Sequence, residues 1–249
     1  MFDVWAQQEG QATAVKVNAP GTVGFGGGID GTRFVYQQIK HSKSDLRLFD
    51  LTTGRRSNMP PGINTTRWEW APTLSGDWLQ FGRSVPGGKQ QVILRNLSTG
   101  EQHVLDTVGK DGDIWTGQVN GGFSVWTKCA GSSCDVFRYE IATGTKTEMP
   151  SYGRQLYAPS VAASGATYYM SGEVDCGGAQ LVKTTLDGRT FILFDTGSAH
   201  DIDTTYALTL PERPPSAPGV RIYIESRKCS TNRSDIYSID DVEPQPPPG

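Results

Sequence analysis

Short runs in which hydrophobic and polar residues alternate recur along the whole chain. The first is the segment 44–54, Ser-Asp-Leu-Arg-Leu-Phe-Asp-Leu-Thr-Thr-Gly, which ends in a Thr-Gly turn. Alternation with a period of two before a glycine turn predicts a β-strand that leads into a hairpin. Four further copies follow at 91–100, 135–144, 180–188 and 234–241. Long stretches with the period of an amphipathic helix are missing from the sequence, so we predict an all-β fold.

The spacing of these copies is nearly constant. Counted from residues 45, 91, 135, 180 and 235, the steps are 46, 44, 45 and 55 residues, and a Pro-rich insertion at 210–219 accounts for the long last step. Each copy follows another apolar run, such as 78–81, and the first four copies precede a further one, such as 102–105. Some copies also have an earlier strand-like run, so a repeat of 44–46 residues holds four strands, as a propeller blade does.

Two of the earliest strands in these repeats share an aromatic-Ala-Pro sequence ahead of a glycine turn. They are Trp70-Ala71-Pro72 and Tyr157-Ala158-Pro159. Together with the alternating strand and the Thr-Gly turn, this pattern resembles the TolB-type, WD-like β-propeller repeat over about residues 20–241. The resemblance implies a five-bladed β-propeller with four-stranded blades. It implies little about activity, because propellers carry many unrelated functions.

The fifth copy ends at Asp241 without an outer strand of its own. The segment 13–20 near the N-terminus matches the ends of two outer strands, 56–60 and 146–150. We therefore predict that residues 13–18 close the last blade by pairing with 235–241, which would remove an exposed sheet edge. The expected domain is 1–241, and the Pro-rich segment 242–249 is expected to be a semi-rigid linker to a further domain.

Charge and hydropathy exclude two classes of partner. A net charge of −3 and a pI of about 5.6 argue against a nucleic-acid module, which usually has a strongly basic face. The sequence contains no run of 18 apolar residues that would span a membrane. The first residues lack the basic and apolar regions of a signal peptide, which leaves a cytosolic protein or an exported one whose signal has been removed. We expect the exported protein, of bacterial origin.

The four cysteines fall in the predicted hairpins between the second and third strands of blades three to five. Four cysteines allow three pairings. Cys129 and Cys134 could bridge one hairpin, which leaves Cys176 to pair with Cys229. Unrelated thiols and a metal site are the alternatives, and no histidine lies near these residues in the sequence to help bind zinc. Two disulfides would indicate an oxidising compartment.

Sequence motifs of catalysis are weak. Gly-x-Ser-x-Gly, P-loop and dinucleotide-binding motifs do not occur in the sequence, so we expect no cofactor. Glycoside hydrolases need paired carboxylates, for which the first-strand acids would be Glu69, Asp113, Asp201 and Asp203. These acids do not hold matching positions in the repeat, so we expect solvated or loop roles for them. An enzyme is therefore not our leading prediction.

The first strand of each predicted blade carries one aromatic residue. These residues hold equivalent positions in the repeat, each four residues before the apolar residue that precedes the first turn. Aromatic side chains bury large areas, so packing between blades would explain these residues, and stacking on a ligand is the alternative. The five aromatic residues are Phe25, Trp70, Trp115, Tyr157 and Tyr206.

One face of the predicted propeller should carry the binding residues. The loops that lead into the first strands share a face with the hairpins between second and third strands, and both bring polar groups toward the aromatic positions, as binding pockets do. We expect a monomeric, non-catalytic module that binds a protein or an extracellular polymer there. The alternative is a carbohydrate-binding lectin or a glycoside hydrolase-like propeller. The predicted ligand-binding residues are Arg67, Trp70, Asp113, Trp115, Arg154, Tyr157, His200, Asp203 and Tyr206.

Overall fold

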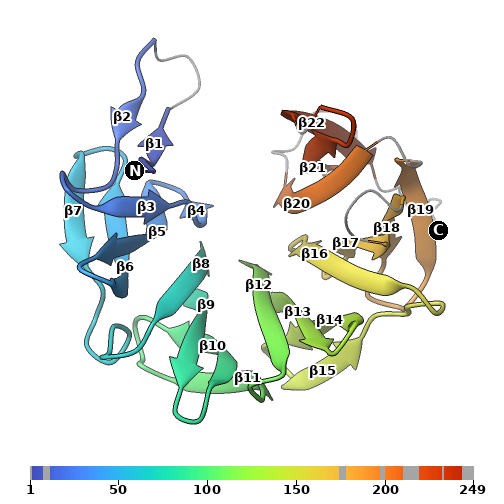
Figure 1. Cartoon of the computed structure of the whole chain (residues 1–249), viewed down its shortest axis with the longest axis horizontal. Helices are drawn as coiled ribbons and strands as arrows, with labels where there is room; N and C mark the ends of the chain where they lie inside the picture. Colours follow the sequence, from blue (N-terminus) through green and yellow to red (C-terminus); the bar gives the residue numbers. More distant parts are fainter. Residues whose placement is uncertain are drawn as a thin grey trace, which may run out of the picture. The chain divides into compact units, whose positions relative to one another are not determined.

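The computed structural model describes residues 2–7, 12–173, 178–196, 200–209, 219–231 and 233–242. The regular elements in these ranges are β-strands, arranged in successive antiparallel sheets (Figure 1). No helix in the described ranges has the length and apolar character needed to cross a membrane. The chain divides into two compact units, Met1–Val119 and Asn120–Gly249, which are described separately.

The first unit contains two complete blades and most of the strand that begins the third blade. The first sheet contains β3 (Val23–Phe25), β4 (Ile29–Asp30), β5 (Arg33–Lys40), β6 (Lys43–Asp50) and β7 (Arg55–Asn58), with β3 and β4 both paired to β5. The second contains β8 (Glu69–Ser75), β9 (Trp78–Val85), β10 (Lys89–Asn96) and β11 (Gln102–Val108). Strand β12 (Gly112–Asn120) begins the third sheet.

The remaining strands belong to the second unit. The third sheet continues with β13 (Phe123–Ala130), β14 (Ser133–Glu140) and β15 (Thr145–Glu148). The fourth contains β16 (Gln155–Val161), β17 (Thr167–Gly172), β18 (Ala179–Thr184) and β19 (Thr190–Asp195). The described part of the fifth contains β20 (His200–Thr209), β21 (Gly219–Lys228) and β22 (Arg233–Val242).

The strand order confirms the predicted all-β, five-bladed β-propeller fold. Each repeat copy forms the third strand of a blade, namely β6, β10, β14, β18 and β22. Buried apolar residues lie between neighbouring blades within each unit. Leu46, Leu74 and Phe81 belong to one such cluster in the first unit, and Met170, Leu181 and Ile222 belong to another in the second.

The aromatic-Ala-Pro sequences form β-bulges. The register of β8 with β9 shifts between Trp70 and Thr73, and that of β16 with β17 shifts between Tyr157 and Ser160. Ala71 has φ 43° and Ala158 has φ 49°, which places both in the left-handed region that alanine rarely adopts. The same bulge therefore occurs at corresponding points of two blades.

Within the segment 13–18, two residues form a short strand that belongs to an N-terminal hairpin. Strand β2 (Val15–Lys16) pairs with β1 (Trp5–Ala6). Val17 packs with Phe34 and Phe49, and the Arg56 guanidinium donates to the Lys16 carbonyl oxygen at 2.9 Å. The pairing of residues 13–18 with 235–241 concerns both units and stays a prediction.

The predicted hairpin disulfide is present. Cys129 and Cys134 face each other across β13 and β14 and are bonded, with their Cα atoms 4.0 Å apart. Cys229 is also disulfide-bonded. Cys176 lies outside the described residues, so its pairing with Cys229 stays a prediction.

Candidate functional site

The loop before a first strand lies beside a hairpin of the preceding blade in the first unit. A Cβ at Gly88, in the hairpin between β9 and β10, would lie 3.2 Å from the Cβ of Lys110, in the loop before β12. The backbone N–H of Ile114 donates to Gln90 Oε1 at 3.2 Å. Within this unit, the two kinds of segment therefore share a face, as the sequence analysis predicted.

The loop before β8 is anchored by polar side chains that are buried or half-buried. The Asn64 side chain accepts from the Leu46 N–H at 2.7 Å and donates to the Leu46 carbonyl at 2.9 Å. Glu69 is fully buried and accepts from Arg83 Nε at 3.0 Å. Arg83 also donates to the Gly62 carbonyl oxygen at 3.2 Å. Glu69 is therefore a buried residue of β8 that anchors this loop, and the solvated or loop role expected for it is wrong.

Trp70 packs within its own blade. It lies opposite Gly82 in the β8–β9 register. A Cβ at Gly82 would come within 2.3 Å of the indole, so the ring covers the glycine and fills the space that a side chain would occupy. Trp70 is half-buried, and its contact with Gly82 supports packing inside the blade in addition to any packing between blades.

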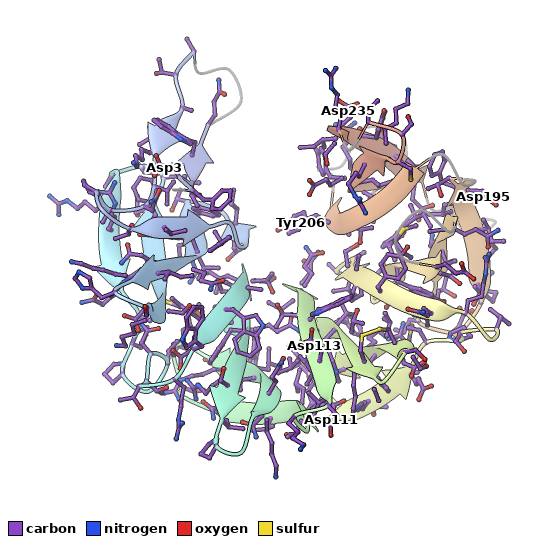
Figure 2. All side chains as sticks on the ribbon, in the orientation of Figure 1. Asp3, Asp111, Asp113, Asp195, Tyr206 and Asp235 are labelled. Carbon is purple, nitrogen blue, oxygen red and sulfur yellow. A yellow bond between two sulfur atoms is a disulfide. The ribbon has the colours of Figure 1, made fainter. Side chains whose placement is uncertain are left out.

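Trp115 is exposed at the start of β12. Its side chain is 43% accessible, and its indole N–H donates to Asp113 Oδ2 at 2.8 Å. The other carboxylate oxygen of Asp113 accepts from the Ile114 N–H at 3.0 Å; Figure 2 labels Asp113. Phe25 is exposed as well. Burial between blades therefore fails to explain Trp115 and Phe25, because much of each ring faces solvent.

The second unit holds the other two aromatic positions. Tyr157 is buried in the hydrophobic cluster of the fourth and fifth blades, as a packing role predicts. Tyr206, labelled in Figure 2, is half-buried and pairs with Tyr223. Its neighbour Thr205 pairs with Ile224, which is buried. Alternation along the strand then directs Tyr206 and Thr205 to opposite faces.

A repeated hydrogen bond shows that Tyr206 and Trp115 are not equivalent. The Thr116 hydroxyl donates to the Ala71 carbonyl oxygen at 2.7 Å. The Thr205 hydroxyl makes the same contact with the Ala158 carbonyl oxygen. Thr116 follows Trp115, whereas Thr205 precedes Tyr206, so the predicted equivalence of these two aromatic residues is wrong by two positions.

The remaining predicted site residues are charged. Arg67 is exposed, and its backbone N–H donates to Thr65 Oγ1 at 3.0 Å. Arg154 is exposed and donates to Gln180 Oε1 at 2.9 Å, which joins the loop before β16 to the start of β18. The backbones of His200 and Asp203 lie in β20, but their side chains lie outside the described residues. Their ligand-binding role stays a prediction.

Two exposed aromatic residues were missed by the sequence analysis. Trp68 precedes β8 and follows Arg67, and its side chain is exposed. Tyr152 lies two residues before Arg154, has φ 50° and is 76% accessible. Both lie in loops that lead into first strands. Their shared sequence signal is an aromatic residue close to an arginine in a loop, outside the strand positions from which the repeat is recognised.

The described residues offer little for metal chemistry. They contain no group of three or more His, Cys, Asp or Glu side chains placed to hold a metal ion. Of the first-strand acids whose side chains are described, Glu69 binds Arg83 and Asp113 binds Trp115. The described loops that lead into first strands instead offer exposed aromatic rings and exposed guanidinium groups, and hydrogen bonds anchor these loops.

Comparisons with known proteins show the fold. The chain matches no protein-family model and no curated protein sequence. Among solved structures, it is similar to TolB from Acinetobacter baumannii, with 15% identity, a TM-score of 0.56, and coverage of 97% of this chain and 60% of that one. Putative TolB from Agrobacterium tumefaciens has 11% identity and a TM-score of 0.56, over 92% of this chain and 86% of that one.

An enzyme also shares this architecture. An oligogalacturonate lyase in complex with manganese has 15% identity and a TM-score of 0.51, over 95% of this chain and 72% of that chain. The chain spans 60% of the length of the Acinetobacter TolB. Binding proteins and enzymes both use such propellers, so function has to be argued from the residues of this chain. On blade order and structural likeness, the chain has the five-bladed, TolB-like β-propeller fold.

Proposed function

We propose that the chain is a non-catalytic binding module that recognises a partner protein through the loops leading into its first strands. The observation that carries this proposal is the placement of exposed aromatic residues near exposed arginines in these loops. Trp68 follows Arg67 in the first unit, and Tyr152 precedes Arg154 in the second. Trp, Tyr and Arg are the residues enriched among those that dominate the binding energy of protein interfaces.

The anchoring of these loops supports the same function. Asn64, Glu69 and Arg83 hold the loop before β8 through partly buried hydrogen bonds. Arg154 joins the loop before β16 to Gln180. A loop that is ordered before binding loses less conformational entropy in the complex, and this raises affinity.

Export from the cytoplasm is part of the proposal. The Cys129–Cys134 disulfide and the bonded state of Cys229 are the observations behind it. Disulfides persist mainly in oxidising compartments such as the bacterial periplasm or the cell exterior. We therefore propose a module of an exported bacterial protein.

A carbohydrate ligand is the second candidate, and one observation favours it. Trp115 leaves much of its ring exposed, while Asp113 fixes its indole N–H. An oriented aromatic face beside a carboxylate combines an apolar surface with a placed polar group, as small-molecule sites do. This candidate predicts that loss of Trp115, rather than of Trp68 or Tyr152, abolishes binding.

Titration of loop variants tests the two candidates. The immobilised chain would capture proteins from an extracytoplasmic extract, and the captured protein would be purified and titrated by calorimetry. We expect Trp68→Ala and Tyr152→Ala each to weaken binding by about 30-fold or more, the scale of an interface hot spot. The control Leu186→Ala, at an exposed apolar residue in the turn after β18, should bind as the parent does.

The outcomes separate the candidates. Equal affinity of the parent and both loop variants would contradict recognition by these residues. Parallel titrations with polygalacturonate and arabinan probe the carbohydrate alternative. Binding of either polymer that Trp115→Ala abolishes, without any protein captured, would favour that alternative.

A further inference from the structure

The outer strand of the fourth blade differs from the other described outer strands. Its sequence is Thr-Phe-Ile-Leu-Phe-Asp, and Phe191, Ile192 and Phe194 are exposed, Ile192 to 61%. By contrast, β7 reads Arg-Arg-Ser-Asn and β15 reads Thr-Lys-Thr-Glu, with all residues exposed. Proteins usually protect edge strands with charged residues. Four consecutive apolar residues on the edge strand β19 lack that protection.

The backbone of β19 presents hydrogen-bonding groups along its outer edge. Strand β19 ends the sheet order β16-β17-β18-β19. The Thr185 N–H donates to the Arg189 carbonyl oxygen at 2.9 Å, and Thr184 is the partner of Thr190 in the register. Hydrogen-bonded and non-hydrogen-bonded pairs alternate in antiparallel sheets. The N–H and C=O groups of Thr190 and Ile192 therefore point away from β18.

We propose that β19 is a self-association surface through which two copies of this chain pair antiparallel, edge to edge. In such a two-fold pair, the residue on the axis lies opposite the same residue of the other copy. With Phe191 at the axis, Thr190 of each copy lies opposite Ile192 of the other. Both residues then use their outward backbone groups, which gives four hydrogen bonds, and the two Phe191 rings meet across the axis.

Charge complementarity supports a second copy as the partner. Arg189 precedes the apolar run, is largely exposed and forms an ion pair with Asp187 at 2.9 Å; Asp195 ends the run and is exposed. Antiparallel pairing brings the start of one strand near the end of the other. The Arg189 end of each copy therefore meets the Asp195 end of its partner, whereas a parallel arrangement would place Arg189 near Arg189 and Asp195 near Asp195. The proposed dimer differs from the monomer expected from the sequence, and the oligomeric state decides between them.

Sedimentation velocity over a range of concentrations tests the proposal on the full chain. We expect a concentration-dependent dimer for the parent and a monomer at all concentrations for Phe191→Lys and Ile192→Lys. The matched control is Val104→Lys, at an exposed apolar residue on the outer strand β11, which should leave dimerisation unchanged. A monomeric parent, or a dimer that both β19 variants retain, would overturn the proposal.

Cysteine cross-linking tests the register independently of affinity. In the proposed pairing, Phe191→Cys places two new thiols opposite each other in a non-hydrogen-bonded pair, where side chains are closest. Oxidation should then yield a covalent dimer. Thr190→Cys faces Ile192 of the other copy, so its thiols should cross-link at least 10-fold more slowly. Equal rates at both positions, with folding verified by circular dichroism, would contradict this register.

Discussion

Lys183 Nζ lies 2.6 Å from Asp241 Oδ2, and this ion pair joins β18 of the fourth blade to β22 of the fifth. The two side chains are only 7% and 12% exposed, and the Tyr168 hydroxyl donates to the same oxygen at 2.7 Å. The pair is thus a buried connection between two blades of the second unit.

Loss of one member of this pair should destabilise the second unit. Lys183→Met leaves the Asp241 carboxylate buried without its cation, which typically costs about 3–5 kcal/mol. The double variant Lys183→Met/Asp241→Leu should recover most of that loss, because apolar replacements of buried pairs are often neutral. Urea unfolding measures both. Equal stability of the parent and Lys183→Met would show that the ion pair is absent or solvated in solution.

Arg138 should contribute to the contact between the third and fourth blades. Its buried guanidinium donates to the carbonyl oxygens of Gly165, Thr185 and Leu186 at 2.8 to 3.3 Å, and burial lowers its pKa. Arg138→Met removes these donors from carbonyl groups that are buried or partly buried, which should cost about 1–3 kcal/mol. The control Arg189→Met, at an exposed arginine, should change the unfolding midpoint little. Similar midpoints for both variants would contradict the role of Arg138.

The two tryptophans of the first-strand positions should differ in their effect on stability. Trp70 covers Gly82 and is half-buried, so Trp70→Ala should cost about 2 kcal/mol, below the 3–5 kcal/mol of a fully buried aromatic residue. Trp115 is largely exposed, so Trp115→Ala should cost less than about 1 kcal/mol. Thermal unfolding measures the order of the two effects, and a larger loss for Trp115 would refute the packing described for Trp70.

Replacing either bulge alanine by glycine should preserve stability, whereas replacing it by valine should lower stability. Ala71 and Ala158 have positive φ angles, a conformation that costs about 1–2 kcal/mol for residues other than glycine. Ala158→Gly should therefore leave stability unchanged or raise it slightly. Ala158→Val should lower it by more than 1 kcal/mol, about the penalty for a β-branched residue at positive φ. Denaturant midpoints that rank valine above glycine would show that the bulge is not formed.

The blades could be predicted from the sequence because strand alternation and glycine turns are local. The equivalence of Trp115 and Tyr206 could not, since it depends on register. Equivalent positions depend on loop lengths and on β-bulges such as the one between Ile202 and Thr204 in β20, and the spacing of residues in the sequence shows neither. The partner of β2 was missed for another reason, because β1 is only two residues long and shows no periodicity.

Hydrogen–deuterium exchange of the chain with and without its captured partner is the most direct test of loop-mediated recognition. Recognition through the loops predicts slower exchange on binding in the segments 59–68, 109–112 and 149–155, which lead into first strands. It predicts no change in the exposed outer strands β7 and β15. Protection confined to outer strands, with these loops exchanging as in the free chain, would contradict the proposed function.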